Sequence, residues 1–165
     1  ARGFLQLARQ ACIDDSDADG LERPGGNAAT EIKRHLLALF DILQSGRFEY
    51  AFRTANEVLR YLRVCRHLAA DRNAWDEKGW QTDLDDQILQ KLLPKLHGSV
   101  GRVGPLLAGL SHYCHSGVSV GASGINMKTA VDLQCGDGTL FPKSLNKLKS
   151  MIRTLQDEQF VSFIQ

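Results

Sequence analysis

The spacing of apolar residues in "EIKRHLLALFDILQ" (31–44) is the sequence feature that most constrains the fold. They recur at intervals of three and four positions: Ile32, Leu36, Leu39, Phe40 and Leu43. That interval places them on one face of an α-helix. Asn27 or Thr30 can cap the start of this helix, and Ser45-Gly46 ends it. Because a helix with one apolar face must bury that face, the chain needs further helices to pack against it.

A second helix is expected from Phe52 to about Ala69, ended by a polar stretch that holds Trp75 and Trp80. Its apolar face consists of Phe52, Ala55, Leu59 and Leu62. We interpret the polar stretch as a connection between helices.

The segment "TDLDDQILQKLLPKLHGS" (82–99) predicts a third helix, with Thr82 or Asp83 as its cap. The apolar residues at helical spacing are Leu84, Ile88, Leu92 and Leu96. Pro94 lies inside this pattern. Because proline lacks a backbone N–H and clashes with the preceding turn, we expect it to kink the helix or to end it near Leu93.

The last third of the chain predicts two more helices and a tail. One helix is expected from about Pro105, a favourable first-turn residue, and another from Ser144 as its cap. Residues 117–140, with five glycines and little helical period, predict a long loop with room for a short hairpin. The apolar "QFVSFI" (159–164) can dock as a strand. The predicted fold class is mainly α, with about five helices, a long glycine-containing loop and a short strand-like tail.

Composition divides the chain at about residue 30. Residues 1–29 combine a helix remnant with "DDSDADGLERPGGN" (14–27), whose acids and glycines cannot bury themselves and predict an acidic linker. Residues 30–165 are expected to form one helical domain. A chain of 165 residues, 43% of them hydrophobic, is long enough for a single core.

The charge balance favours no large charged partner. Lys and Arg number 20 and Asp and Glu number 19, for a net charge of +1, so no overall field attracts nucleic acid or an anionic membrane. The apolar runs are too short to cross a bilayer, and the first residues lack a signal-peptide pattern. We therefore expect a cytoplasmic protein without a membrane partner. Its cysteines are expected to be reduced thiols: Cys12, Cys65, Cys114 and Cys135.

One motif superficially matches a phosphate-binding loop. In "GVSVGASGINMKT" (117–129), Lys128-Thr129 stand in the order of G-x-x-x-x-G-K-[ST]. Met127 and Ala122, however, occupy the two positions where that loop needs glycine for its backbone to wrap a phosphate. The sequence therefore predicts no nucleotide-hydrolysing site, and no catalytic residue is assigned.

Four side chains near the predicted fourth helix and its loop are chemically able to bind zinc: His112, Cys114, His115 and Cys135. Adjacent ligands at a helix end differ from the paired turns, such as C-x-x-C, that usually build a structural zinc site. We expect a buried cysteine and exposed histidines instead, and assign no metal ligand.

Three arginines recur every three positions along the predicted second helix: Arg60, Arg63 and Arg66. Such a row can contact phosphates of a nucleic acid. More often it is the solvated face of a helix, and that is the interpretation we favour.

Arg53 opens the second helix, in "YAFRTANEVLRYL" (50–62). Helix starts favour acidic residues, because their unpaired backbone N–H groups already make that end positive. Arg53 opposes this preference, which makes it a candidate for binding an anion. The simpler interpretation is a surface ion pair with Glu49 or Glu57, each one helical turn away.

Three segments together resemble one protein family. They are "FEYAFRTANEVLRYL" (48–62), "DDQILQKLLPKLHGS" (85–99) followed by "VGPLL", and "FPKSLNKLKSMIRTLQDEQFVSF" (141–163). They are similar to the C-terminal part of McrB-type AAA+ NTPases, the motor subunits of modification-dependent restriction systems. The resemblance covers roughly Thr30 to Phe163, and "LPKLHGS" is its most specific element.

The resemblance implies a helical lid that follows a nucleotide-binding core. Arg53 matches the position of the sensor-2 arginine, which reaches the terminal phosphates when such a lid closes. The core's phosphate loop and magnesium-binding acids are missing here, so the chain would hold no cofactor and hydrolyse nothing alone. ATP or GTP with Mg²⁺ would bind the parent protein. The implied partners are the preceding AAA+ core, neighbouring subunits of a ring and a nuclease subunit, with DNA reached only through the full assembly.

One departure from the family stands after "LPKLHGS". Members often continue with consecutive basic residues, whereas here "VGRVG" (100–104) leaves Arg102 alone, which puts any contact made by those charges in doubt. Two alternatives remain open at the level of sequence. One is a helical module that binds a protein through the loop 117–140, and the other is a helical nucleic-acid-binding domain.

Overall fold

The computed structural model describes residues 27–48, 52–119 and 126–163, and they form a mainly helical domain with one small sheet, as predicted. The α-helices are α2 (Ala28–Ser45), α3 (Phe52–Leu68), α4 (Arg72–Ala74), α5 (Trp80–Gln87), α6 (Val100–Ser116), α7 (Met127–Asp132) and α8 (Pro142–Glu158). The other elements are the π-helices η1 (Trp75–Gly79) and η2 (Ile88–Leu92), the 3-10 turn η3 (Leu93–Lys95) and the strands β1 (His97–Ser99) and β2 (Phe160–Ser162). Most of the predicted segment 1–29 lies outside the described residues.

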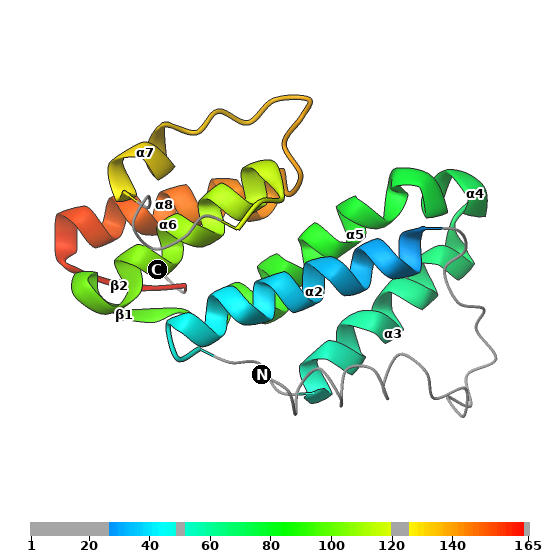
Figure 1. The fold of residues 1–165 in the computed structure, drawn as a ribbon, viewed down its shortest axis with the longest axis horizontal. Coiled ribbons are helices and arrows are strands. Elements are labelled where there is room, and N and C mark those ends of the chain that lie inside the picture. The colour runs from blue at the N-terminus through cyan, green and yellow to red at the C-terminus, as the bar shows by residue number, and fades with distance from the viewer. Residues whose placement is uncertain (1–26, 49–51, 120–125, 164–165) are drawn as a thin grey trace.

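The helices form two groups that share one core. Figure 1 shows α6, α7, α8 and the two strands on one side, and α2, α3 and α5 on the other. Within the first group α6 packs on α7 and α8, while in the second α3 packs on α5; α2 joins the groups by contacting both α5 and α6. All five apolar residues predicted for the first helix are buried, which confirms that face: Ile32, Leu36, Leu39, Phe40 and Leu43.

The polar stretch before the third helix is itself helical, so the predicted cap was wrong. Asp71 caps instead: its Oδ1 accepts hydrogen bonds from Asn73 N at 2.9 Å and Ala74 N at 3.2 Å. From there the chain continues through α4, η1 and α5, which places Thr82 and Asp83 inside a helix. The spacing of apolar residues does not predict a helix in this stretch, because its buried residues are two isolated tryptophans, Trp75 and Trp80, and not a repeating apolar face.

Three other predicted boundaries differ from the structure. Helix α6 begins at Val100, so Pro105 lies inside it rather than in its first turn. Helix α8 begins at Pro142, which occupies the first-turn position that suits proline, and Ser144 is a buried helical residue rather than a cap. Within the predicted loop 117–140, Asn126 accepts a hydrogen bond from Lys128 N at 2.9 Å and starts α7.

The segment around Pro94 breaks the α-helix, as predicted, but by a change of helix type. The α-helix stops at Gln87, widens into η2 and then tightens into η3, which contains Pro94. Strand β1 follows at once, with Gly98 at a φ of 145° that favours glycine. It pairs antiparallel with β2, so the apolar tail docks as a strand, as predicted.

A buried carboxylate fastens α5 to the start of α8. Asp85, only 1% exposed, accepts hydrogen bonds from two backbone groups in the first turn of α8, Lys143 N at 2.8 Å and Ser144 N at 2.9 Å. The Ser144 hydroxyl donates back to the Asp85 carbonyl at 3.2 Å. Burial raises the pKa of Asp85, although the bonds from Ser144 and Lys143 oppose that rise. Asp85 therefore caps the N-terminus of α8, although it belongs to another helix and does not directly precede α8 in the sequence.

Replacing Asp85 should loosen this joint. In Asp85→Ala, two first-turn N–H groups lose a buried acceptor, and we expect the free energy of unfolding to fall by about 2 kcal/mol. The neighbouring Asp86 provides a matched control, because it pairs with the half-exposed Lys143 ammonium at 2.6 Å. Urea unfolding of both variants measures the difference. An equal loss in Asp86→Ala would show that Asp85 has no special structural role.

Candidate functional site

Arg53 is the second residue of α3, and its side chain extends into solvent. It is 90% exposed, and its Nε donates a hydrogen bond to Glu57 Oε1 at 3.2 Å, one helical turn away. The first turn of α3 contains no acidic residue. The ion pair expected from the sequence is therefore present with Glu57, whereas Glu49 lies outside the described residues.

Two lysines from two further elements lie near the start of α3, and the sequence predicted neither of them as a site residue. Lys91 Nζ in η2 donates to Glu57 Oε2 at 3.2 Å, and Lys95 Nζ in η3 donates to Thr54 Oγ1 at 3.1 Å. We call Arg53, Thr54, Glu57, Lys91 and Lys95 the Arg53 cluster. It brings together three basic side chains around one carboxylate and one hydroxyl.

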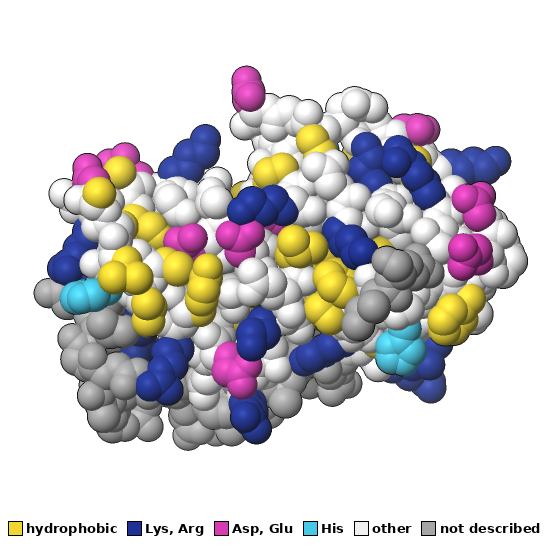
Figure 2. All heavy atoms as spheres, turned by 180° about the vertical axis from the view of Figure 1, so that it is seen from behind, with side chains coloured by type: hydrophobic (Ala, Val, Ile, Leu, Met, Phe, Trp, Pro, Cys, Tyr) yellow, Lys and Arg dark blue, Asp and Glu magenta, His cyan; other side chains and the backbone are white. Residues whose placement is uncertain are grey.

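The Arg53 cluster has three basic side chains and one carboxylate, and the pKa values of Glu57 and Lys95 are lowered within it. The hydrogen bonds from Lys91 and then Arg53 lower the pKa of Glu57, so the carboxylate stays ionised. Burial is the main cause that lowers the pKa of Lys95, with Glu57 opposing and Lys91 adding to the effect. Figure 2 shows the face opposite to that of Figure 1, where basic and acidic side chains are scattered among apolar ones.

The π-helix η2 explains why these lysines reach α3. A π-turn holds an extra residue and so changes which side chains face the core. Here Leu92 and Leu93 are both buried, while Lys91 and Lys95 are exposed and bond to α3. No rule for reading sequence predicts such a turn, although "LPKLHGS", the most specific segment of the family resemblance, contains Lys95.

An open groove of about 390 Å³ begins at the Arg53 cluster and runs between α3 and the end of α5. Its lining consists of Glu57, Arg60, Tyr61, Val64, Gln87, Gln90 and Lys91. Gln87 is only 2% exposed, and its Oε1 accepts no hydrogen bond from any described residue. An acceptor left unpaired in this way is uncommon in folded proteins and needs an explanation.

Arg60, Arg63 and Arg66 of α3 do not form a uniform basic row. Arg66 makes a two-point ion pair with Asp76, with Nε to Oδ1 at 2.8 Å and Nη2 to Oδ2 at 2.7 Å, and only 11% of its side chain is exposed. Arg60 instead lines the groove. Arg66 therefore fixes η1 to α3, in a pairing that the sequence spacing did not indicate.

The side chains considered for zinc binding are spread between the core and the surface. Cys114 is fully buried, and burial raises the pKa of its thiol, whereas Cys135 is exposed with its Sγ 3.2 Å from Asn146 Oδ1. Among the described residues, no group of three or more His, Cys, Asp and Glu side chains is arranged to hold a metal ion. Likewise, no helix in the described part of the chain is long and apolar enough to cross a membrane.

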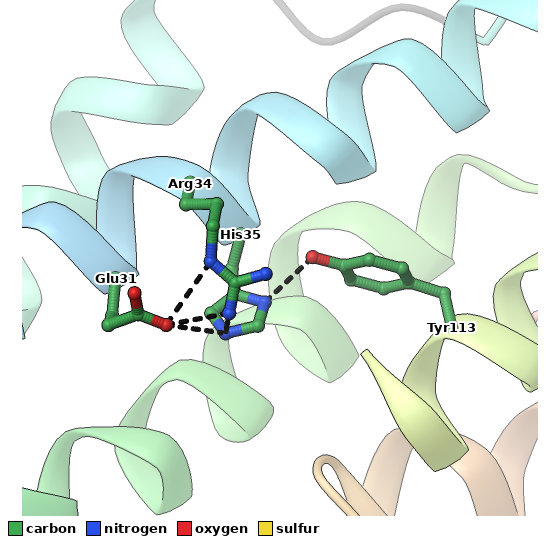
Figure 3. A network of polar contacts seen from close by, with 4 residues as sticks. All are labelled: Glu31, Arg34, His35 and Tyr113. Atoms are coloured by element: carbon green, nitrogen blue, oxygen red, sulfur yellow. Dashed lines mark hydrogen bonds and ion pairs between the residues drawn. The ribbon is translucent and has the colours of Figure 1, made fainter. Parts of the chain in front are cut away.

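A second polar network runs from the surface of α2 to a buried contact between α2 and α6. Figure 3 shows Glu31, Arg34 and His35 of α2 meeting Tyr113 of α6. Arg34 can only donate, so His35 Nε2 accepts from it at 3.1 Å and Nδ1 donates to the Tyr113 hydroxyl at 2.7 Å. The imidazole is enclosed by aromatic rings, Trp80, Tyr113 and Phe141. His35 and Tyr113 are buried, whereas the side chains of Arg34 and Glu31 are 52% and 39% exposed, so we assign a structural role to the His35–Tyr113 pair.

Comparison with known proteins places the chain in one family. The family described as "Domain of unknown function (DUF8727)" matches residues 6–160, nearly the whole chain. The chain belongs to this family. No curated protein and no solved structure matches it. The family description assigns no activity, so any function has to be argued from the residues of the domain.

The buried imidazole predicts how stability depends on pH. Burial, followed by the charge of Arg34, lowers the pKa of His35 to about 4. Between that value and about 6.5, the unfolded chain binds a proton that the folded chain does not, so stability falls as the pH falls through this range. We expect His35 to contribute a loss of about 3 kcal/mol between pH 7 and pH 4.

The matched comparison is His35→Gln, followed by urea unfolding at intervals from pH 7 to pH 4. The variant should be less stable at pH 7 but should lose less stability on acidification, because it has no imidazole to protonate. Asp85, whose raised pKa has the opposite effect, is present in both proteins and cancels in the difference. Parallel pH profiles would contradict the assignment of a neutral His35.

Proposed function

We propose that this domain is the helical lid of an AAA+ NTPase of the restriction or defence type, and that Arg53 is its sensor-2 arginine. The observation that carries the proposal is the position of Arg53, a solvent-exposed guanidinium in the first turn of α3 with Lys91 and Lys95 nearby. A guanidinium stays charged and offers several donors in one plane, which suits phosphate oxygens. The resemblance around "LPKLHGS" supports the same reading.

In this proposal the domain is not catalytic alone. A preceding AAA+ core supplies the phosphate loop and the acids that bind Mg²⁺, and ATP or GTP binds between core and lid. Closure of the lid brings Arg53 to the terminal phosphates and couples hydrolysis to movement between ring subunits. A nuclease subunit and DNA are reached through the assembly, in the cytoplasm.

The fold is compatible with such a role. Lid closure needs a domain that moves as a unit. The hydrogen bonds of Asp85 link α5 to α8, and the bond between His35 and Tyr113 links α2 to α6 within the core. Arg53 lies outside that core, so a contact to phosphate would not require the domain to unfold. Only an exposed bond to Glu57 has to be released.

The proposal predicts that Arg53→Ala has different effects in two proteins. In the isolated domain the melting temperature should barely change, because an exposed ion pair contributes little to stability. In the complete NTPase, hydrolysis should fall by about tenfold or more, since a charge-assisted contact to phosphate contributes roughly 1.5–3 kcal/mol. The measurements are thermal unfolding and steady-state hydrolysis.

Lys128→Ala is the matched control, because it also removes one exposed positive charge but lies on α7. It should leave hydrolysis unchanged. Normal hydrolysis in Arg53→Ala would exclude the sensor-2 assignment. A large drop in melting temperature of the isolated Arg53→Ala domain would instead mark Arg53 as a structural residue. Turnover by the isolated domain itself would contradict the lid proposal.

A further inference from the structure

The solvent-facing side of α3 carries a row of apolar side chains. Val64 is 38% exposed and Leu68, one turn later, is 75% exposed, and they are two of the four exposed large hydrophobic residues in the described part of the chain. Tyr61 lies one turn before Val64, and both line the open groove between α3 and the end of α5. We call Tyr61, Val64, Leu68 and the neighbouring Arg60 the α3 outer face. An apolar row beside a groove is typical of a surface that another segment covers.

The surroundings of the α3 outer face are basic. Arg60 and Lys91 line the groove, and Arg53 bonds to Glu57 at its edge. Glu57 is the one acidic residue of α3, and Arg53 and Lys91 share its carboxylate. The positive charge here therefore exceeds the negative charge that α3 provides. An occupant that matches this surface combines an apolar side with several acidic groups.

The chain itself contains such a segment just before α2, at residues 4–22, which we call the acidic segment. It lies outside the described residues, so its properties are taken from the sequence. Four of its apolar residues have the spacing of one helical face: Phe4, Leu7, Ala8 and Ala11. Its acidic residues follow them: Asp14, Asp15, Asp17, Asp19 and Glu22. The family match begins at residue 6, so most of the acidic segment belongs to the same family unit as the helices.

The acidic segment joins the described domain close to the end of α3. Helix α2 contacts η1, and Arg66 of α3 pairs with Asp76 of η1 at 2.7 Å. Figure 1 shows the start of α2 near α4 and the end of α3. An extended chain advances by about 3.3 Å per residue, so the stretch from Asp19 to Asn27 can span about 26 Å. Since the 17 residues of α3 are also about 26 Å long, the acidic segment can reach the whole α3 outer face.

We propose that the acidic segment docks on the α3 outer face of its own chain. Its apolar residues pack against Tyr61, Val64 and Leu68, and its carboxylates lie near Arg60 and the cations at the edge of the groove. The contact covers the apolar row and adds negative charge to a helix that has one acidic residue. This inference is independent of the lid proposal, because it concerns how the domain covers its own surface.

The test is paramagnetic relaxation in the full 165-residue chain, with a spin label on Cys12 of the acidic segment. Cys65→Ser and Cys135→Ser remove the other accessible thiols, and Cys114 is buried. The amide signals of residues 60–68 should broaden strongly, whereas those of α7, in the other group of helices, should not. Unbroadened signals in α3 would show that the acidic segment does not dock there and would overturn the proposal.

A label on Cys135 provides the matched control, in a chain with Cys12→Ser and Cys65→Ser. Because the Cys135 thiol lies 3.2 Å from Asn146 Oδ1, this label should broaden the first half of α8 and leave α3 unchanged. A second control mixes spin-labelled chains with isotope-labelled chains that carry no spin label. Broadening of α3 in that mixture would show that a second copy supplies the segment and would contradict docking within one chain.

Two variants of the Cys12-labelled chain test the chemistry of the contact. Leu68→Asp should remove most of the broadening, because it places a charge in the apolar row and repels the acidic segment. Val118→Asp alters an equally accessible apolar residue beyond the end of α6, 61% exposed, and should leave the broadening unchanged. Equal effects of the two variants would exclude the α3 outer face as the docking surface.

The contribution of charge is tested by replacing four acids together, Asp14→Asn, Asp15→Asn, Asp17→Asn and Asp19→Asn. This variant should lose most of the broadening of α3, and raising the salt concentration to about 0.5 M should weaken it in the unchanged acidic segment, because salt screens surface charges. Full broadening in the Asn variant would show that charge does not hold the acidic segment and would overturn the proposal.

Discussion

The hydrogen bonds between Asp85 and the first turn of α8 are the constraint on which the rest of the domain depends. Asp85 lies in the last turn of α5, directly before η2, and its carboxylate accepts hydrogen bonds from the first turn of α8. Beyond η2 the chain enters β1, which pairs with the strand that leaves α8. The segment 85–99 is therefore anchored at one end to the start of α8 and at the other end to β2, and the lysines between those anchors bond to Glu57 and Thr54 of α3.

The helical faces could be predicted from sequence because apolar residues repeat wherever a helix is half buried. The face of α2 and the docking of the C-terminal tail were confirmed on that basis. The helical structure around Trp75 could not be predicted from the sequence, because its contacts with the core are made by two large side chains that do not recur at helical spacing. Boundaries failed where a tertiary contact replaced a local one: Asp85 caps α8 from a distant helix, so the local candidate Ser144 was not needed as a cap.

Of the candidate site, the sequence predicted Arg53 but neither Lys91 nor Lys95. Arg53 stood out because it opposes the electrostatic preference of a helix start, a rule that needs no knowledge of the fold. Lys91 and Lys95 obey every local preference, and only the altered helix geometry of η2 and η3 brings them to Thr54 and Glu57. Residues whose role depends on a change of helix type give no local signal, whereas a residue that violates a local rule does.

Because of the π-turn, the positions of Lys91 and Lys95 depend on the number of residues in η2. An α-helical turn in place of η2 would leave out about one residue, rotating everything after it by about 100° and shifting it by about 1.5 Å along the axis. The direction in which Lys95 points is thus encoded in the number of residues between two anchors as much as in their identity. A related chain with one residue deleted from η2 could keep the whole sequence "LPKLHGS" and still present a different surface to α3.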